Sequence, residues 1–148
     1  MAQDYTDQIK RMAAGWVQAT GLVITLATED EVRGEWELGP QHLQNYGIVH
    51  GGVYCGVIET LASIGAHIVA SSRGQQAVGA ENHTSFIRAV GTGRLFGVAK
   101  PVTRGRTSQV WEAWIRDAEG RLIAQGTVRL LCIAAEQLAG KTAPGTAS

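Results

Sequence analysis

An apolar segment at residues 48–70, IVHGGVYCGVIETLASIGAHIVA, constrains the fold of this chain more than any other feature. As a helix at about 1.5 Å per residue it would be roughly 30 Å long, the width of a small domain. A helix that is apolar all round must be covered by other elements on most sides. Yet the segment contains one carboxylate, Glu59, whose charge is costly to bury without a partner. We therefore expect a buried central helix, from about His50 to Ser72, with an unusual charged position inside it.

The remaining segments predict the strands that would cover this helix. Residues 22–40 favour two strands with a turn near Glu29–Glu31, because apolar and polar positions alternate. Four further strands are predicted, over residues 76–90, 93–104, 107–120 and 121–135. The order indicates an α+β fold with an antiparallel sheet wrapped around one long helix.

The two ends of the chain frame this core. Residues 3–19 favour a short amphipathic helix, since Ile9, Met12, Ala13 and Trp16 recur at helical spacing. Residues 136–148 are polar and predict a flexible tail. The 148 residues are thus interpreted as a single domain, 1–148, with its core over 20–135.

Charge and composition exclude several classes of function. Thirteen Lys and Arg residues balance thirteen Asp and Glu residues, which argues against a general nucleic-acid or membrane-surface binder. The apolar segment contains Glu59, His67 and several Gly and Ser residues, so we interpret it as buried in protein and not in a membrane. The N-terminus has no apolar signal core and the two cysteines have no metal spacing, which favours a cytoplasmic protein. Four His residues without ligand-like spacing predict no metal site.

The element order, together with QNYGIVHGGVYCGVIETLAS at residues 44–63, resembles the hotdog-fold acyl-CoA thioesterases. The closest resemblance is to the 4-hydroxybenzoyl-CoA and 1,4-dihydroxy-2-naphthoyl-CoA thioesterases of the phenylacetate-pathway type, which use a catalytic Glu. It covers about residues 18–135, and NHTSFIR and DAEGRLIA are further family-like segments. The resemblance implies a hotdog fold. It also implies hydrolysis of an acyl-CoA thioester, with an aromatic acyl group, to the free acid and coenzyme A. Coenzyme A is then part of the substrate, and no other cofactor is implied.

The resemblance also implies roles for individual residues. Glu59 would be the nucleophile or general base, and the Gly51 backbone N–H at the helix N-terminus would polarise the thioester carbonyl. Gln44 would bind the thioester or the attacking water, Ser63 would orient that water or Glu59, and His50 would bind the acyl carbonyl or a ring hydroxyl. Each position has a structural alternative. Glu59 could pair with an Arg, Ser63 could bond the preceding turn, and His50 could be a satisfied structural histidine.

Binding of coenzyme A phosphates requires cationic contacts, and the chain contains no GxGxxG or GxxxxGK[ST] loop. The resemblance implies nucleotide contacts from Arg88 and turn contacts from Arg106 and Thr107. Arg104 is a further candidate, for which a solvated turn position is an equal alternative.

Hotdog subunits cover an open sheet edge by association, so the resemblance implies a homodimer or homotetramer. The site would be composite, with Gln44 and Gly51 from one subunit and Glu59 and Ser63 from the other. Two alternative functions remain on the same fold. One is a hydratase or dehydratase acting on the acyl chain, and the other is a non-catalytic acyl-CoA binder.

Overall fold

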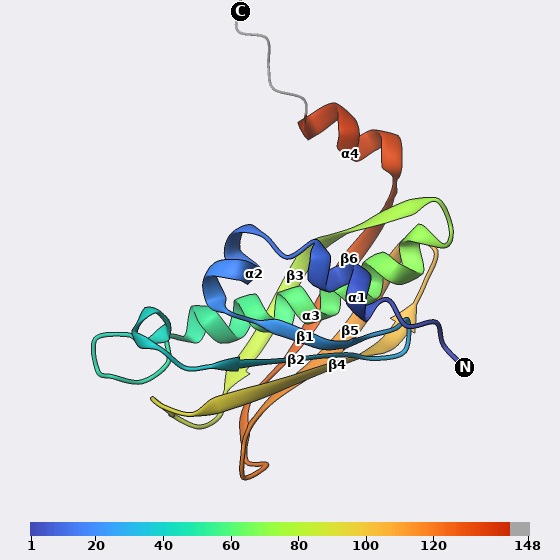
Figure 1. Ribbon diagram of the computed structural model, residues 1–148. Helices are drawn as coiled ribbons and strands as arrows, with labels where there is room; N and C mark the ends of the chain where they lie inside the picture. The colour runs from blue at the N-terminus through green and yellow to red at the C-terminus, as the bar shows by residue number, and fades with distance from the viewer. Residues whose placement is uncertain (143–148) are drawn as a thin grey trace, which may run out of the picture.

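The central helix predicted from the apolar segment is present as α3 (Gly51–Ser71). In the computed structural model, which describes residues 1–142, one antiparallel sheet curls around this helix (Figure 1). The six strands are β1 (Val23–Ala27), β2 (Val32–Glu37), β3 (Gln75–Phe86), β4 (Arg94–Arg104), β5 (Ser108–Asp117) and β6 (Leu122–Ala134). Their spatial order is β1-β2-β4-β5-β6-β3, which places β1 and β3 at the two edges. The predicted α+β architecture is confirmed.

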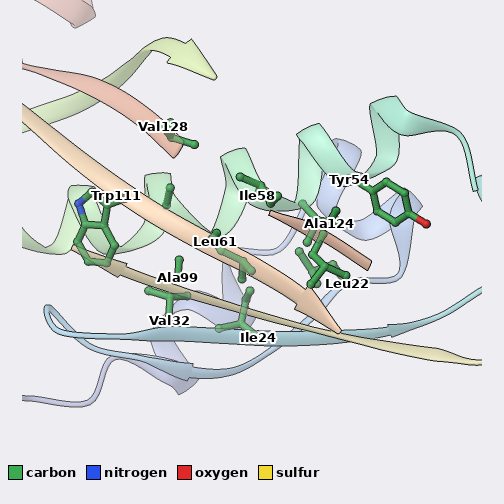
Figure 2. Packing of buried hydrophobic residues seen from close by; sticks show 14 of the residues in the cluster. Leu22, Ile24, Val32, Tyr54, Ile58, Leu61, Ala99, Trp111, Ala124 and Val128 are labelled. Carbon is green, nitrogen blue, oxygen red and sulfur yellow. The ribbon is translucent and has the colours of Figure 1, made fainter. Parts of the chain in front are cut away.

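The helix α3 is held by the concave face of the sheet. By length and composition alone it could cross a membrane, but ten of its 21 residues are buried within the described protein. Figure 2 shows Ile58 and Leu61 of α3 in one apolar layer with side chains from the strands, including Ile24, Val32 and Trp111. Burying a side chain of this size contributes about 1.5–3 kcal/mol. The apolar character of the segment therefore stabilises a protein core.

Both ends of the chain differ from the sequence predictions. The single helix expected over residues 3–19 is wrong, because two short helices, α1 (Thr6–Arg11) and α2 (Gly15–Thr20), occupy this region. Gly15 has a φ of +56°, a conformation that a continuous right-handed helix cannot contain. The flexible tail predicted over 136–148 is also corrected in part. Helix α4 (Ala135–Thr142) follows β6, and residues 143–148 lie outside the described residues.

The connections fix the position of the site. A turn at residues 28–31 joins β1 to β2, as predicted, with the Thr28 hydroxyl accepting from the Asp30 and Glu31 N–H groups. A short 3-10 helix, η1 (Pro40–His42), precedes the loop that leads into α3. The buried ring of His42 ties this loop to the protein. Its Nδ1 accepts from the Gly39 N–H at 2.9 Å, and its Nε2 lies 2.7 Å from the Thr20 carbonyl.

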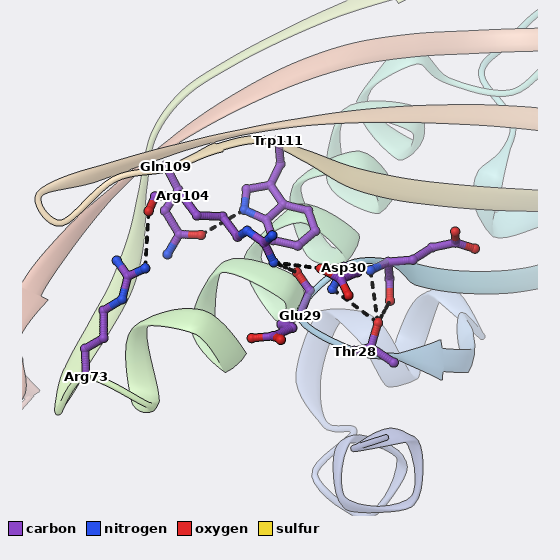
Figure 3. Close-up of polar contacts among 8 residues, drawn as sticks. Thr28, Glu29, Asp30, Arg73, Arg104, Gln109 and Trp111 are labelled. Atoms are coloured by element: carbon purple, nitrogen blue, oxygen red, sulfur yellow. Dashed lines mark hydrogen bonds and ion pairs between the residues drawn. The ribbon is translucent and has the colours of Figure 1, made fainter. Parts of the chain in front are cut away.

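A polar pair inside the core gives the first testable prediction. Gln109 and Trp111 of β5 are both fully buried, and the indole Nε1 of Trp111 donates to the Gln109 Oε1 at 3.0 Å (Figure 3). Gln109 in turn donates to the Ala66 carbonyl at 3.0 Å, so it links β5 to α3. Gln109→Leu should lower the free energy of unfolding by about 1–3 kcal/mol, because the indole N–H would lose its partner in an apolar environment. Urea denaturation measures this.

The matched control is Gln125→Leu on β6. The Gln125 side chain is also hydrogen-bonded, donating to Glu112 at 3.1 Å, but on the half-buried outer face of the sheet. We expect this variant to lose less stability, because water can replace the missing contact. An equal loss in the two variants would show that burial of the indole N–H is unimportant.

Candidate active site

Glu59 lies on α3 about two turns after the helix begins, and its half-buried carboxylate contacts β3. The Asn82 side chain donates to Oε2 through Nδ2 at 3.0 Å. The Ser63 hydroxyl, one turn further along α3, donates to Oε1 at 3.4 Å. Among the described residues no Lys, Arg or His forms an ion pair with Glu59. The Arg-paired alternative for Glu59 is therefore not observed.

The Glu59 carboxylate lies between β3 and a surface depression with several apolar residues. A Cβ atom at Gly79 of β3 would lie 2.3 Å from Oε1, so a side chain there would displace the Glu59 carboxylate from its present position. The carboxylate opens on a depression of about 430 Å³ whose apolar lining comes from Ile9, Met12, Ile64 and Ala77. Ser63 lines the same depression, and its hydroxyl points to Glu59. The bond to the preceding turn is made instead by Thr60, to the Gly56 carbonyl at 2.8 Å.

The N-terminus of α3 presents backbone N–H groups at its first turn. His50 caps the helix, because its Nδ1 accepts from the Gly52 N–H at 2.9 Å. This is the structural role considered for His50, and it leaves Nε2 exposed. No described residue accepts the N–H of Gly51. Gly51 packs against the ring of Phe86, where an added Cβ would lie 2.4 Å from the nearest ring atom. The Gly51 N–H is thus available to an oxygen acceptor at the positive end of the helix.

Gln44 lies near this helix end in the loop between η1 and α3. Its Oε1 accepts from the Tyr46 N–H at 2.7 Å, so the amide orientation leaves Nε2 as a donor. Gln44 and Gly51 line a second depression of about 280 Å³, together with Phe86 and Arg88. Tyr54 of α3 lines it as well. Burial raises the pKa of Tyr54 to about 12, and its hydroxyl has no partner among the described residues.

The predicted catalytic residues therefore fall into two groups within one chain. Glu59 and Ser63 lie together at the first depression, and Gln44 and Gly51 lie together at the second. No residue in the described part of the chain lines both depressions. One chain alone does not bring the two groups to a common reacting atom.

The residues predicted to contact coenzyme A differ in whether their side chains already have partners within the protein. Arg88 is exposed beside Gln44 and Gly51, and no described residue forms an ion pair with it. Arg104 is engaged, since its guanidinium contacts the Asp30 carboxylate at 2.8 Å and the Glu29 carbonyl at 3.1 Å (Figure 3). Arg106 and Thr107 lie exposed in the turn between β4 and β5. Arg104 thus stands at the end of β4 with an ion-pair partner, in place of the solvated turn position considered as its alternative.

Sequence reasoning did not single out Asn82 or Tyr54. Asn82 stands in a polar stretch of β3 where neither face shows an apolar pattern, and its approach to Glu59 depends on a strand irregularity. Tyr54 stands among the core residues of α3, so the sequence does not show that its hydroxyl is buried without a hydrogen-bond partner. In the described part of the chain, no three His, Cys, Asp or Glu side chains gather closely enough to hold a metal ion.

Comparison with known proteins identifies the fold. The Thioesterase superfamily profile matches residues 46–124. The Rv1847 protein of Mycobacterium tuberculosis is 41% identical over 112 residues, which cover 74% of this chain and 80% of Rv1847. Its solved structure has a TM-score of 0.79 and covers 81% of this chain and 97% of that chain. The proofreading thioesterase EntH of Cronobacter sakazakii is 35% identical over 105 residues, covering 71% of this chain and 76% of EntH. The hotdog fold expected from residues 44–63 is therefore confirmed.

Proposed function

Since this chain belongs to the thioesterase superfamily and is a thioester hydrolase, we propose that it cleaves an aromatic acyl-CoA to the free acid and coenzyme A, with Glu59 as nucleophile or general base. One observation carries this proposal. The Glu59 carboxylate has no cationic partner in the described protein, and it opens on a depression whose apolar residues are joined by Thr60, Ser63 and His67. A carboxylate inside an apolar helix that only stabilised the fold would be expected to pair with a cation.

The proposed chemistry divides among the two groups of residues. Glu59 either attacks the thioester carbonyl carbon or removes a proton from a water that does so. In both cases negative charge develops on the carbonyl oxygen. The Gly51 N–H can donate to that oxygen at the positive end of α3, and the free Nε2 of Gln44 can donate to it or to the water. Cleavage of the C–S bond then releases coenzyme A.

A second copy of the chain would bring the two groups together. The strand β3 is a sheet edge, and residues 79–83 and 85–89 are exposed in the single chain, including Phe86 at 56% and Ile87 at 54%. An unpaired edge with exposed apolar side chains favours pairing with another strand. Glu59 contacts β3 at Gly79 and Asn82, whereas Gly51 contacts it at Phe86. Antiparallel pairing of two β3 strands about a two-fold axis would place the Phe86 end of one beside the Glu59 region of the other.

The aromatic acyl group is supported by two features. Residues 44–63 resemble thioesterases that act on hydroxybenzoyl and dihydroxynaphthoyl groups. The depression beside Glu59, at about 430 Å³, is large enough for a ring, and Ile9, Met12, Ile64 and Ala77 provide apolar contacts to it.

A panel of acyl-CoA substrates tests the proposed function. Aromatic and straight-chain thioesters are compared by release of free thiol, with an enoyl-CoA followed by its absorbance. We expect thiol release, fastest with aromatic thioesters. Preference for straight chains would contradict the aromatic assignment. A change in enoyl absorbance without thiol release would favour a hydratase, and binding without any turnover would favour an acyl-CoA binder.

Arg88→Ala should raise KM for acyl-CoA by about 5- to 10-fold and leave kcat nearly unchanged. A phosphate contact from the unpaired guanidinium would act equally in the ground state and the transition state. The increase should disappear with a pantetheine thioester that lacks the nucleotide. An equal change of KM with the full and the truncated substrate would rule out a nucleotide contact. Arg116→Ala is the control, since Arg116 is exposed on β5 and its guanidinium donates to the Gly120 carbonyl.

A further inference from the structure

We infer that Asn82 is a positioning residue that holds the Glu59 carboxylate in its reactive orientation. Its Nδ2 donates to Oε2 of Glu59 at 3.0 Å, from the opposite wall of the site. This inference rests on the proposed function, because it assigns Asn82 a role in the reaction through Glu59.

The Asn82 amide has only one orientation that satisfies its contacts. Nδ2 donates both to Glu59 and to the Cys55 carbonyl, the latter at 3.1 Å. Oδ1 accepts from the Thr84 hydroxyl at 2.7 Å. If the amide were flipped, its oxygen would face a carboxylate and a carbonyl, neither of which can donate. The amide therefore presents a fixed N–H to Glu59 and ties α3 to β3 beside it.

A bulge in β3 makes this contact possible. In a regular strand, residues 79 and 82 would point to opposite faces of the sheet, because side chains alternate. The pairing of β3 with β6 shifts register between Gly79 and Glu81, so one extra residue is inserted there. As a result Gly79 and Asn82 both face Glu59. Gly79 leaves space for Oε1, and Asn82 bonds Oε2.

The two oxygens of the Glu59 carboxylate therefore differ in their hydrogen bonding. Oε2 accepts a 3.0 Å hydrogen bond from Asn82, while Oε1 receives, among residues 1–142, only the long 3.4 Å contact from Ser63. Oε1 is the oxygen left to attack the thioester or to accept a proton from water. Holding a Glu side chain in one such geometry lowers the barrier by orientation, and a displacement of about 1 Å can cost up to about 100-fold in rate.

Substitutions at Asn82 separate this role from packing. Asn82→Asp keeps the shape but replaces the N–H donor with a carboxylate that repels Glu59. We expect it to lower kcat up to about 100-fold with KM within about twofold of wild type. Asn82→Ala should lower kcat about 10-fold, and Thr84→Val less, because the amide donor remains. Thr127→Ala, exposed on the outer face of β6, is the control and should not change kcat. Wild-type kcat in Asn82→Asp would overturn the inference.

A second measurement does not depend on activity. The side-chain amide signal of Asn82 in an NMR ¹⁵N–¹H spectrum is assigned by its loss in Asn82→Asp. The Asn82 signal should shift in Glu59→Gln, because that substitution removes the charged acceptor. It should not shift in Glu112→Gln, because the Glu112 carboxylate accepts from Gln125 and not from Asn82. An unmoved signal in Glu59→Gln would contradict the contact. If the wild-type protein released no thiol from any acyl-CoA, the proposed function would fail, and this spectrum would still decide whether Asn82 holds Glu59.

Discussion

Glu59→Gln should reduce kcat for the best acyl-CoA substrate by about 10²- to 10⁴-fold, the usual loss for a positioned acid-base group. Glutamine has the shape of glutamate, but it can neither attack a thioester nor accept the proton of a water at neutral pH. Because it has the same shape, it should still fit against Gly79 of β3, which lies next to the carboxylate. Thiol release at saturating substrate measures the change, and thermal unfolding shows whether the protein remains folded.

The control for this substitution is Glu112→Gln. Glu112 is also half-buried and also accepts one side-chain hydrogen bond from an amide, but it lies on the outer face of β5. We expect it to retain wild-type kcat. If Glu59→Gln were folded and fully active, Glu59 could be neither the nucleophile nor the general base.

The main elements could be predicted because burial imposes a regular pattern on them. The helix expected from His50 to Ser72 extends from Gly51 to Ser71, and the strands follow in the expected order. The strand expected over residues 76–90 ends earlier, at Phe86. The N–H groups of Ile87 and Arg88 both donate to the Ile123 carbonyl, so the regular ladder with β6 stops there. Residue types do not indicate that two successive N–H groups will share one carbonyl acceptor, so this end of the strand could not be predicted from the sequence.

The N-terminal helix was mispredicted because its apolar spacing continues across a break. Ile9, Met12 and Trp16 keep helical spacing, yet Gly15 adopts a positive φ between the two short helices. Trp16 still packs onto α3, where a Cβ at Gly56 would lie 2.4 Å from its ring. Met12 and Trp16 nevertheless remain 64% and 46% exposed in the single chain. Periodicity alone did not reveal the change of direction at Gly15.

The candidate site was only partly visible in the sequence. Glu59 stood out from the residues alone, because burying an unpaired carboxylate in an apolar helix is costly. Its catalytic role depended on the resemblance of residues 44–63. Gln44 and Gly51 depended on the resemblance of residues 44–63, since a loop Gln and a helix-entry Gly have no distinctive pattern. Asn82 could not be found, because the bulge between Gly79 and Glu81 reverses the alternation that predicts which side chains share a face.

Mixing two inactive variants should restore activity if the site is composite. Gln44→Ala removes a catalytic group from the depression beside Gly51, and Glu59→Gln removes one from the depression beside Ser63. Each variant alone carries one defect in every site, and we expect about 1% of wild-type activity or less from each. In a mixed dimer of the two, one site combines both defects and the other has none. After subunit exchange at equal concentrations, half of the dimers are mixed, so about a quarter of all sites are intact.

The mixture should therefore recover to about a quarter of wild-type activity, at least roughly 25-fold above either variant. Subunits are exchanged by mild denaturation and dilution, thiol release is measured, and light scattering gives the mass of the product. A mixture of Glu59→Gln with Glu59→Ala should recover nothing, because every site then lacks the carboxylate. If all catalytic groups met within one chain, the first mixture would show only the average of its two components. A fully active wild-type protein with the mass of a monomer would also exclude the composite site, because the exposed edge of β3 would then have no partner strand.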